Sequence, residues 1–309
     1  MIATVALDDL GVVSLRGPDA RAFLQGQLTN DLALLSAERS IFAALANAQG
    51  RVIHFVRVLA WDEAVLLCLP GGDAPALRDH LARYVLRARV ELRDESAGWC
   101  GLGILAIADT DHATLAQRLG ALPARAGGVS RHGDLLVLAI DAQRLAVVGP
   151  TSALDRLGTE LCVSAAPLHD WLLADIRSGV PAIEPATRAL FLPQMINLDL
   201  LGGISFTKGC YTGQEVVART QHLGRIKRRM LRARGAFAPP LPGSPVLARG
   251  EVSGHVVRAV SDEHGECELL ATVSLADRDQ PLTIGDGIPL ELLSLPYAIP
   301  ELGDASTAR

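Results

Sequence analysis

Residues 205–215 read SFTKGCYTGQE, and eight of them place a primary amine, a thiol, a phenol, an amide and a carboxylate close together. Lys208 is one of only two lysines in the chain, against 27 arginines. Gly209 and Gly213 bracket Cys210 and permit a tight loop whose backbone closely approaches a neighbouring group. A turn between two core segments is the plainer interpretation of these glycines. The stretch therefore predicts either a reactive loop or a simple turn.

Cys210 is the cysteine that this loop sets apart. Lys208 and the basic residues downstream favour its thiolate, which is the reactive form. Cys68 and Cys267 stand in apolar, strand-like runs, where a free thiol packs as a small hydrophobic group. The five cysteines have no C-x2-C spacing, and the histidines form no pair at helical spacing, so the sequence predicts no bound metal and a reducing compartment.

The composition is that of an ordinary globular protein, with 309 residues, 49% hydrophobic and 20% charged. The apolar runs are too short to span a membrane and the first ten residues contain two aspartates where a signal peptide has basic charge, which predicts a cytoplasmic protein. A net charge of -5 makes nucleic acid an unlikely general partner. Residues 219–234 nevertheless carry seven Arg or Lys and no acid, which fits a solvated strand and turn, or a seat for an anionic ligand tail or RNA.

The order of strand and helix patterns predicts an α+β fold in four parts. Two similar α/β modules are expected over 1–97 and 98–165. A third segment, 166–235, begins with a helix over 167–179 and carries the SFTKGCYTGQE stretch. The Pro-rich FAPPLPGSP then reads as a linker, and the short alternating strands after it predict a C-terminal β-barrel over 236–309.

Residues 208–215, KGCYTGQE, resemble the signature K-G-C-Y-x-G-Q-E of the YgfZ family, folate-binding relatives of the glycine-cleavage T-protein that support iron-sulfur cluster assembly and repair. The resemblance covers about the first 230 residues and runs through these segments: FLQGQLTND (23–31), NAQGR (47–51), DIRSGVP (175–181), FLPQMINL (191–198), GGISF (202–206), VVAR (216–219) and HLGRIKRR (222–229). It implies two ferredoxin-like α/β modules around a central folate pocket, plus a C-terminal β-barrel.

The resemblance implies that Cys210 and Lys208 are working groups beside a pocket for tetrahydrofolate or a derivative. The other signature residues belong to the same site: Gly209, Tyr211, Gly213, Gln214 and Glu215. Cys210 stands alone, so any contact with an iron-sulfur cluster is transient or shared with a partner. Glu215, beside many basic groups, is expected to act as an ion-pair partner of a buried arginine.

Several residues are candidates for binding the folate itself. Trp171 matches a family tryptophan linked to folate, although it also lies on an apolar helix stripe typical of a core residue. Arg177 suits bidentate pairing with a carboxylate. The remaining candidates come from the resemblance: Leu10, which replaces a second folate-linked tryptophan, the pocket-rim residues Asn47, Gly50 and Arg51, and the polar Gln27. On the residues alone, NAQG is a hairpin turn and Gln27, with Asn30 and Asp31, is a helix cap.

The aminomethyltransferases of the superfamily carry an aspartate pair after the Gly50 corner, where this chain has His54 and Phe55. Phenylalanine does not move protons, so the leading hypothesis is a tetrahydrofolate-binding protein that assists assembly or repair of iron-sulfur enzymes, including those that serve tRNA modification. Its expected partners are reduced folate and iron-sulfur enzymes or cluster-assembly proteins. An aminomethyl or other one-carbon transferase is the alternative, and an RNA-interacting module that uses residues 219–234 is the second. Whether turnover occurs stays open.

Overall fold

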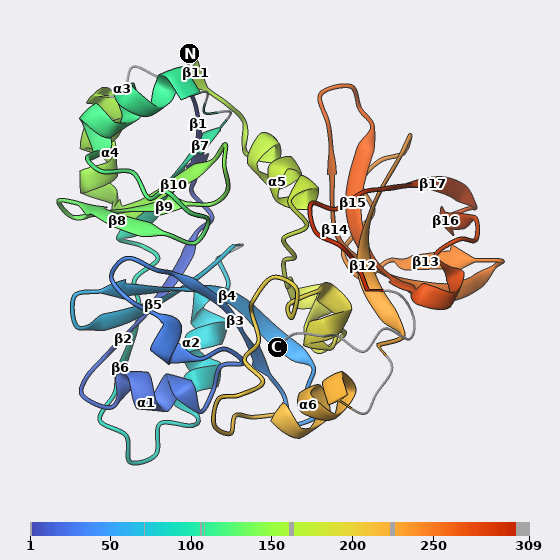
Figure 1. Cartoon of the computed structure of the whole chain (residues 1–309), viewed down its shortest axis with the longest axis horizontal. Coiled ribbons are helices and arrows are strands. Elements are labelled where there is room, and N and C mark those ends of the chain that lie inside the picture. Colours follow the sequence, from blue (N-terminus) through green and yellow to red (C-terminus); the bar gives the residue numbers. More distant parts are fainter. Residues whose placement is uncertain are drawn as a thin grey trace. The chain divides into compact units, whose positions relative to one another are not determined.

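The structure is a computed structural model that describes residues 2–70, 72–105, 107, 109–160, 164–222 and 226–300. The chain divides into two compact units, each described here by itself. The first unit contains Met1–Ala43 and Val56–Trp171, and the second contains Ala44–Phe55 and Leu172–Arg309. Figure 1 follows the elements in sequence colours, from blue to red.

A five-stranded sheet has the strand order β3-β4-β5-β2-β6. Its strands are β2 (Gly11–Arg16), β3 (Ile41–Ala46), β4 (Val52–Trp61), β5 (Ala64–Leu69) and β6 (Glu91–Asp94). Helices α1 (Ala20–Gln25) and α2 (Ala74–Ala82) pack on this sheet. Leu77 and Leu81 of α2 are four residues apart, so they share one face of the helix, and both are fully buried. A short 3-10 helix, η1 (Leu32–Leu34), follows α1.

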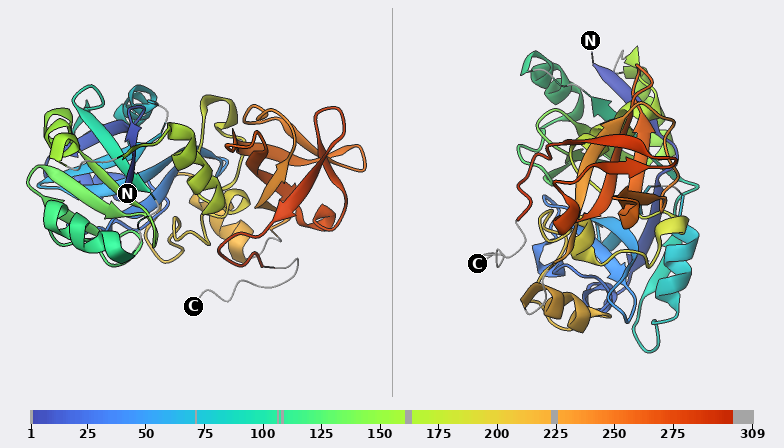
Figure 2. Two further views of the ribbon diagram at one scale, coloured as in Figure 1. Left: turned by 90° about the horizontal axis from the view of Figure 1, so that it is seen from above. Right: turned by 90° about the vertical axis from the view of Figure 1, so that its right-hand side faces the viewer.

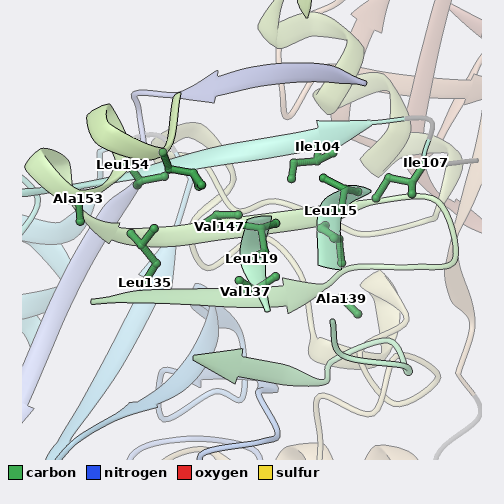
Figure 3. Close-up of a cluster of buried hydrophobic side chains, with 12 residues drawn as sticks. Ile104, Ile107, Leu115, Leu119, Leu135, Val137, Ala139, Val147, Ala153 and Leu154 are labelled. Atoms are coloured by element: carbon green, nitrogen blue, oxygen red, sulfur yellow. The ribbon is translucent and has the colours of Figure 1, made fainter. Parts of the chain in front are cut away.

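A six-stranded sheet has the order β11-β1-β7-β10-β9-β8. Its strands are β1 (Ala3–Leu7), β7 (Trp99–Leu105), β8 (Val129–His132), β9 (Leu135–Ala139), β10 (Leu145–Pro150) and β11 (Ser164–Ala165). Helices α3 (Asp109–Leu119) and α4 (Thr151–Glu160) contribute Leu115, Leu119 and Leu154 to the apolar layer on Val137 and Val147 (Figure 3). Because β1 belongs to this sheet, the predicted module 1–97 gives its first strand to the predicted module 98–165.

The C-terminal barrel is closed, with the order β12-β15-β14-β13-β16-β17 (Figure 2). Its strands are β12 (Arg228–Gly235), β13 (Pro245–Ala248), β14 (Glu251–Ser261), β15 (Cys267–Ser274), β16 (Leu282–Ile284) and β17 (Ile288–Leu293). The predicted boundary at 236 needs correction because β12 pairs with β15 over its whole length. FAPPLPGSP is therefore a loop between two barrel strands, since proline marks loops within domains as well as between them.

The remaining elements are helical, and all but the last precede the barrel in the chain. They are α5 (Leu168–Arg177), η2 (Pro185–Thr187), η3 (Pro193–Ile196), α6 (Gln214–His222) and η4 (Leu275–Asp277). The predicted helix over 167–179 corresponds to α5, whereas α6 lies where the sequence suggested only a loop, strand and turn. The α+β class and the C-terminal barrel are both confirmed. Within the part of the chain that the structure describes, no helix has the length and apolar character needed to cross a membrane.

Candidate functional site

The signature loop buries its amine and phenol and exposes its thiol. Lys208 is only 8% exposed, and its Nζ lies 5.2 Å from the ring centroid of Tyr211, a cation–π contact. Burial raises the pKa of Tyr211 above its ordinary value, so the phenol stays neutral at physiological pH. Cys210, between these two residues, is exposed. The loop therefore exposes the sulfur of Cys210, while the buried side chains of Lys208 and Tyr211 pack against each other.

Gly213 ends the loop in close backbone contact with the corner at Gly50. A Cβ on Gly213 would lie 2.3 Å from the carbonyl oxygen of Asn47 and 2.9 Å from Cα of Gly50. A Cβ on Gly50 would lie 2.9 Å from Cβ of Val216 in α6. Both glycines also have positive φ, at 81° and 72°, where a side chain is strained. Glycine is thus required on both sides of this contact.

Asn47 builds the corner that receives Gly213. Its Oδ1 accepts hydrogen bonds from the backbone N–H of Gln49 at 3.0 Å and of Arg51 at 2.9 Å, and its carbonyl accepts from Gly50 at 2.9 Å. The exposed Arg51 donates from Nη1 to the carbonyl of Leu190. The structure therefore brings Asn47, Gly50 and Arg51 together with the signature loop in one unit, and Asn47 acts there as the turn-forming residue.

Gln214 and Glu215 open helix α6 directly after the loop. Glu215 is exposed, which corrects the expectation that its removal leaves a buried arginine unpaired. A carboxylate in the first turn instead interacts favourably with the positive end of the helix dipole. The predicted loop thus continues as a helix that begins four residues after Cys210.

Arg177, at the end of α5, is held by a buried carboxylate of the barrel. Its Nε and Nη2 both donate to Oε1 of Glu268, at 2.9 and 2.7 Å. Oε2 of Glu268 accepts from Nε and Nη2 of Arg232, at 2.8 and 2.6 Å. The side chain of Glu268 is 7% exposed and that of Arg177 is 51% exposed. Two guanidinium groups on one carboxylate leave a net positive charge at a half-exposed position.

Trp171 lies in the other unit, where its indole packs against β7. A Cβ on Gly103 would come within 2.4 Å of the ring, so the glycine leaves the space that the indole fills. The guanidinium carbon of Arg144 lies 5.1 Å from the ring centroid, and Trp171 is 7% exposed. Trp171 is therefore a packed residue, as its apolar helix stripe indicated, and its link to folate stays a prediction.

Leu10 and Gln27 also lie in the first unit. The side chain of Leu10 lies beside Gly101, 3.3 Å from where a Cβ would stand, and Gln27 is partly buried just after α1. Asn30 donates to the carbonyl of Phe42 at 2.6 Å, and Asp31 accepts from the N–H of Ala33 at 2.9 Å. Asn30 and Asp31 therefore shape the loop after α1, and Asp31 caps η1.

The basic run over 219–234 is less positive in the structure than in the sequence. Three of its arginines form ion pairs: Arg229 with Asp199, Arg232 with Glu268 and Arg234 with Glu291. Arg225 lies outside the described residues. The carboxylates come from distant segments, which explains why the sequence showed a run without acids.

The residues at the aspartate-pair positions are buried, His54 at 2% and Phe55 at 6% exposure. Both lie on β4 and belong to the packed interior of the fold. The described residues hold no group of three His, Cys, Asp or Glu side chains that could bind a metal ion.

Three residues that contact a candidate residue or the helix after the signature loop escaped the sequence analysis. Glu268 reads as one acid in the strand pattern GECELLATV, and its two arginines are 36 and 91 residues away. Gly103 stood in an ordinary apolar strand, although a glycine within a strand often marks a close approach. Gln194 lies within FLPQMINL, and the signal available in the sequence was a polar residue in a largely apolar stretch.

Comparison with solved structures places this fold in a class. The solved glycine cleavage system aminomethyltransferase T from Bartonella henselae has the same fold, with a TM-score of 0.78 over 97% of this chain and 87% of that chain, at 15% identity. The protein is thus built on the aminomethyltransferase fold. No family model matches the sequence.

Curated relatives identify the family within that class. The tRNA-modifying protein YgfZ of Sodalis glossinidius is 32% identical, over 97% of this chain and 94% of its own length. The protein of the same name from Pectobacterium carotovorum is 33% identical, over 87% of this chain and 83% of its own length. The chain therefore belongs to the YgfZ family.

Proposed function

We propose that this protein binds a reduced folate and assists the assembly or repair of iron-sulfur enzymes, with Cys210 and Lys208 as the working groups. The observation that carries the proposal is the signature loop, which exposes a thiol between a buried lysine and a buried tyrosine. Cys68 and Cys267 are buried, so neither offers comparable access. Because the relatives are named tRNA-modifying proteins, the enzymes served include those that modify tRNA.

The residues present fit a reduced folate. The positive charge left over at Arg177, Arg232 and Glu268 suits an anionic glutamate tail. For the rings, Trp171 stays the candidate that the family resemblance implies, and its 7% exposure leaves little of the indole open for stacking. The folate would supply one-carbon chemistry when bound, while the chain's own residues would orient it and exclude water.

Two other functions find less support. Aminomethyl transfer of the T-protein type needs a positioned acid or base, and the buried His54 and Phe55 replace the aspartate pair. RNA binding through 219–234 is weakened by the three ion pairs of Arg229, Arg232 and Arg234. Arg219, Lys227 and Arg228 remain exposed. If the RNA alternative holds, they would bind tRNA through a contact that weakens as salt is added.

The test combines a cellular and a binding assay. In a Pectobacterium carotovorum strain without its own YgfZ, the parent chain should restore the modified tRNA nucleosides lost in that strain, measured by mass spectrometry. Cys210→Ala should not restore them, whereas the matched Cys68→Ala should, provided both are expressed in soluble form. Calorimetry with tetrahydrofolate should give a micromolar dissociation constant for the parent and for Cys210→Ala. Equal restoration by both variants, or no folate binding by the parent, would contradict the proposal.

A further inference from the structure

The segment 193–199 connects the signature helix α6 to the barrel. Gln194, fully buried, donates from Nε2 to the carbonyl of Val217 in α6 at 2.8 Å. The backbone carbonyl of the same residue accepts from Nη1 of Arg229 in β12 at 2.9 Å. A single residue is therefore hydrogen-bonded to the helix through its side chain and to the barrel through its backbone.

The barrel side of this connection is rigid. Nη1 and Nη2 of Arg229 donate to the two carboxylate oxygens of Asp199, at 2.6 and 2.9 Å. The side chains of this pair are 2% and 5% exposed, and a bidentate pair fixes both position and orientation. The next residue of β12, Met230, exchanges two hydrogen bonds with the amide of the buried Asn197, at 2.8 and 3.3 Å. The segment is thus anchored to two consecutive residues of the strand.

The helix side leads directly to the thiol. Val216 and Val217 are adjacent in α6, and the first lies against Gly50 while the carbonyl of the second receives Gln194. The helix begins at Gln214, right after the loop that carries Cys210. The first turn of α6 is therefore held on one side by the Gly50 corner and on the other by Gln194.

We infer that Gln194, itself held by the buried Arg229–Asp199 pair, is a positioning residue for the Cys210 loop, which makes the barrel part of the scaffold of the site. The inference rests on the proposed function for its biological meaning. The loop and α6 should loosen when the Gln194 amide is lost, whether or not the protein binds folate or serves iron-sulfur enzymes.

Gln194→Met tests this role because it keeps the length of the side chain and removes the amide. Loss of one buried hydrogen bond should raise amide hydrogen exchange over 210–222 about tenfold. The rate of Cys210 alkylation, and the pH at which that rate is half-maximal, should change as well. Asp199→Asn, which keeps the shape of the side chain, should change both quantities in the same direction and to a smaller extent. If Gln194→Met does not fold, the same two measurements on Asp199→Asn test the inference instead.

Glu268→Gln is the matched control, since it removes a buried charge of the barrel that contacts α5 rather than α6. It should lower the melting temperature and leave both the exchange over 210–222 and the Cys210 alkylation profile unchanged. Exchange and alkylation in Gln194→Met equal to those of the parent would overturn the inference, as would the same changes in Glu268→Gln. If Gln194→Met loosens the loop while Cys210→Ala still restores tRNA modification, the positioning role stands and the proposed function fails.

Discussion

Glu268 and Arg177 form an ion pair in which one carboxylate oxygen accepts hydrogen bonds from two guanidinium nitrogens, Nε and Nη2. The other oxygen receives Arg232, so a single barrel carboxylate fixes the last residue of α5. Asp175, two residues before Arg177, forms an ion pair with Arg258 of β14, in which Oδ2 of the aspartate lies 3.7 Å from Nη1 of the arginine. The hydroxyl of Tyr297 donates to the carbonyl of Gly179 at 2.8 Å. The end of α5 is thus tied to the C-terminal region at three points.

Glu268→Gln should therefore destabilise the protein by about 2 kcal/mol, because two arginines lose a charged hydrogen-bond acceptor that is almost fully buried. Chemical denaturation followed by fluorescence measures this change in the free energy of unfolding. Glu291→Gln is the control, since it breaks the exposed pair with Arg234 and should have no measurable effect. Equal stability of the two variants would mean that solvent replaces Glu268 without cost.

The glycines of the signature loop differ in what they tolerate. Gly213→Ala should cost at least about 2 kcal/mol, because its Cβ would meet the carbonyl of Asn47 at a strained positive φ. Gly209→Ala should stay within about 0.5 kcal/mol of the parent, since nothing lies within 4 Å of the added Cβ. Thermal denaturation of the two variants distinguishes them. A tolerated Gly213→Ala would show that the loop is not seated on the corner.

Cys210 should react faster than the other three cysteines that the structure describes. Cys210 is exposed and Cys100 partly exposed, while Cys68 and Cys267 are buried. Burial raises the pKa of Cys100, although a hydrogen bond with Thr151 opposes this, which disfavours its thiolate at neutral pH. Limiting alkylation at pH 7 followed by peptide mapping should therefore label Cys210 first. First labelling at Cys100 would contradict the exposure argument. Cys162 lies outside the described residues.

Alkaline pH should destabilise the fold through the buried thiol of Cys68. Burial raises its pKa to about 12, although Arg57 nearby opposes the shift, whereas an unfolded thiol titrates near 8.5. The protonated Cys68 thiol contributes fully to the stability of the fold below a pH of about 8.5. This contribution is lost as the pH rises toward 12, because in that range only the unfolded state releases the proton. Between pH 8.5 and 10 the parent should lose about 2 kcal/mol more than Cys68→Ala. Parallel pH profiles of unfolding would show that the thiol is not buried.

The sequence predicted the α+β class, the barrel and the loop around Cys210, because local periodicity and one contiguous signature carry those features. It did not show that Lys208 is buried, and from its place in a glycine-bracketed loop alone, replacing Lys208 by Ala would leave stability within about 1 kcal/mol of the parent. Because the chain buries this side chain against Tyr211, the same replacement is now expected to destabilise the protein. Helix α6 was missed because its residues show no clear apolar stripe beyond Val217. The partners of Arg229 and Arg177 lie 30 and 91 residues away, and local patterns do not specify such pairs.

Crowding at Gly103 offers a test of Trp171 that leaves the tryptophan itself unchanged. In Gly103→Ala the new Cβ would lie 2.4 Å from the indole, so the ring must move. If the indole forms a wall of the folate site, tetrahydrofolate affinity should fall about fivefold or more, which corresponds to about 1 kcal/mol of binding free energy. Calorimetric titration measures this change.

The control is Gly149→Ala, at an equally crowded position in the same sheet. Its Cβ would meet Leu135 at 2.6 Å and the carbonyl of Asp134 at 2.8 Å, away from the tryptophan. It should lower the melting temperature comparably and leave the affinity for tetrahydrofolate unchanged. If both variants lose affinity to the same degree, the loss follows from general destabilisation, and Trp171 is a core residue without a direct part in binding.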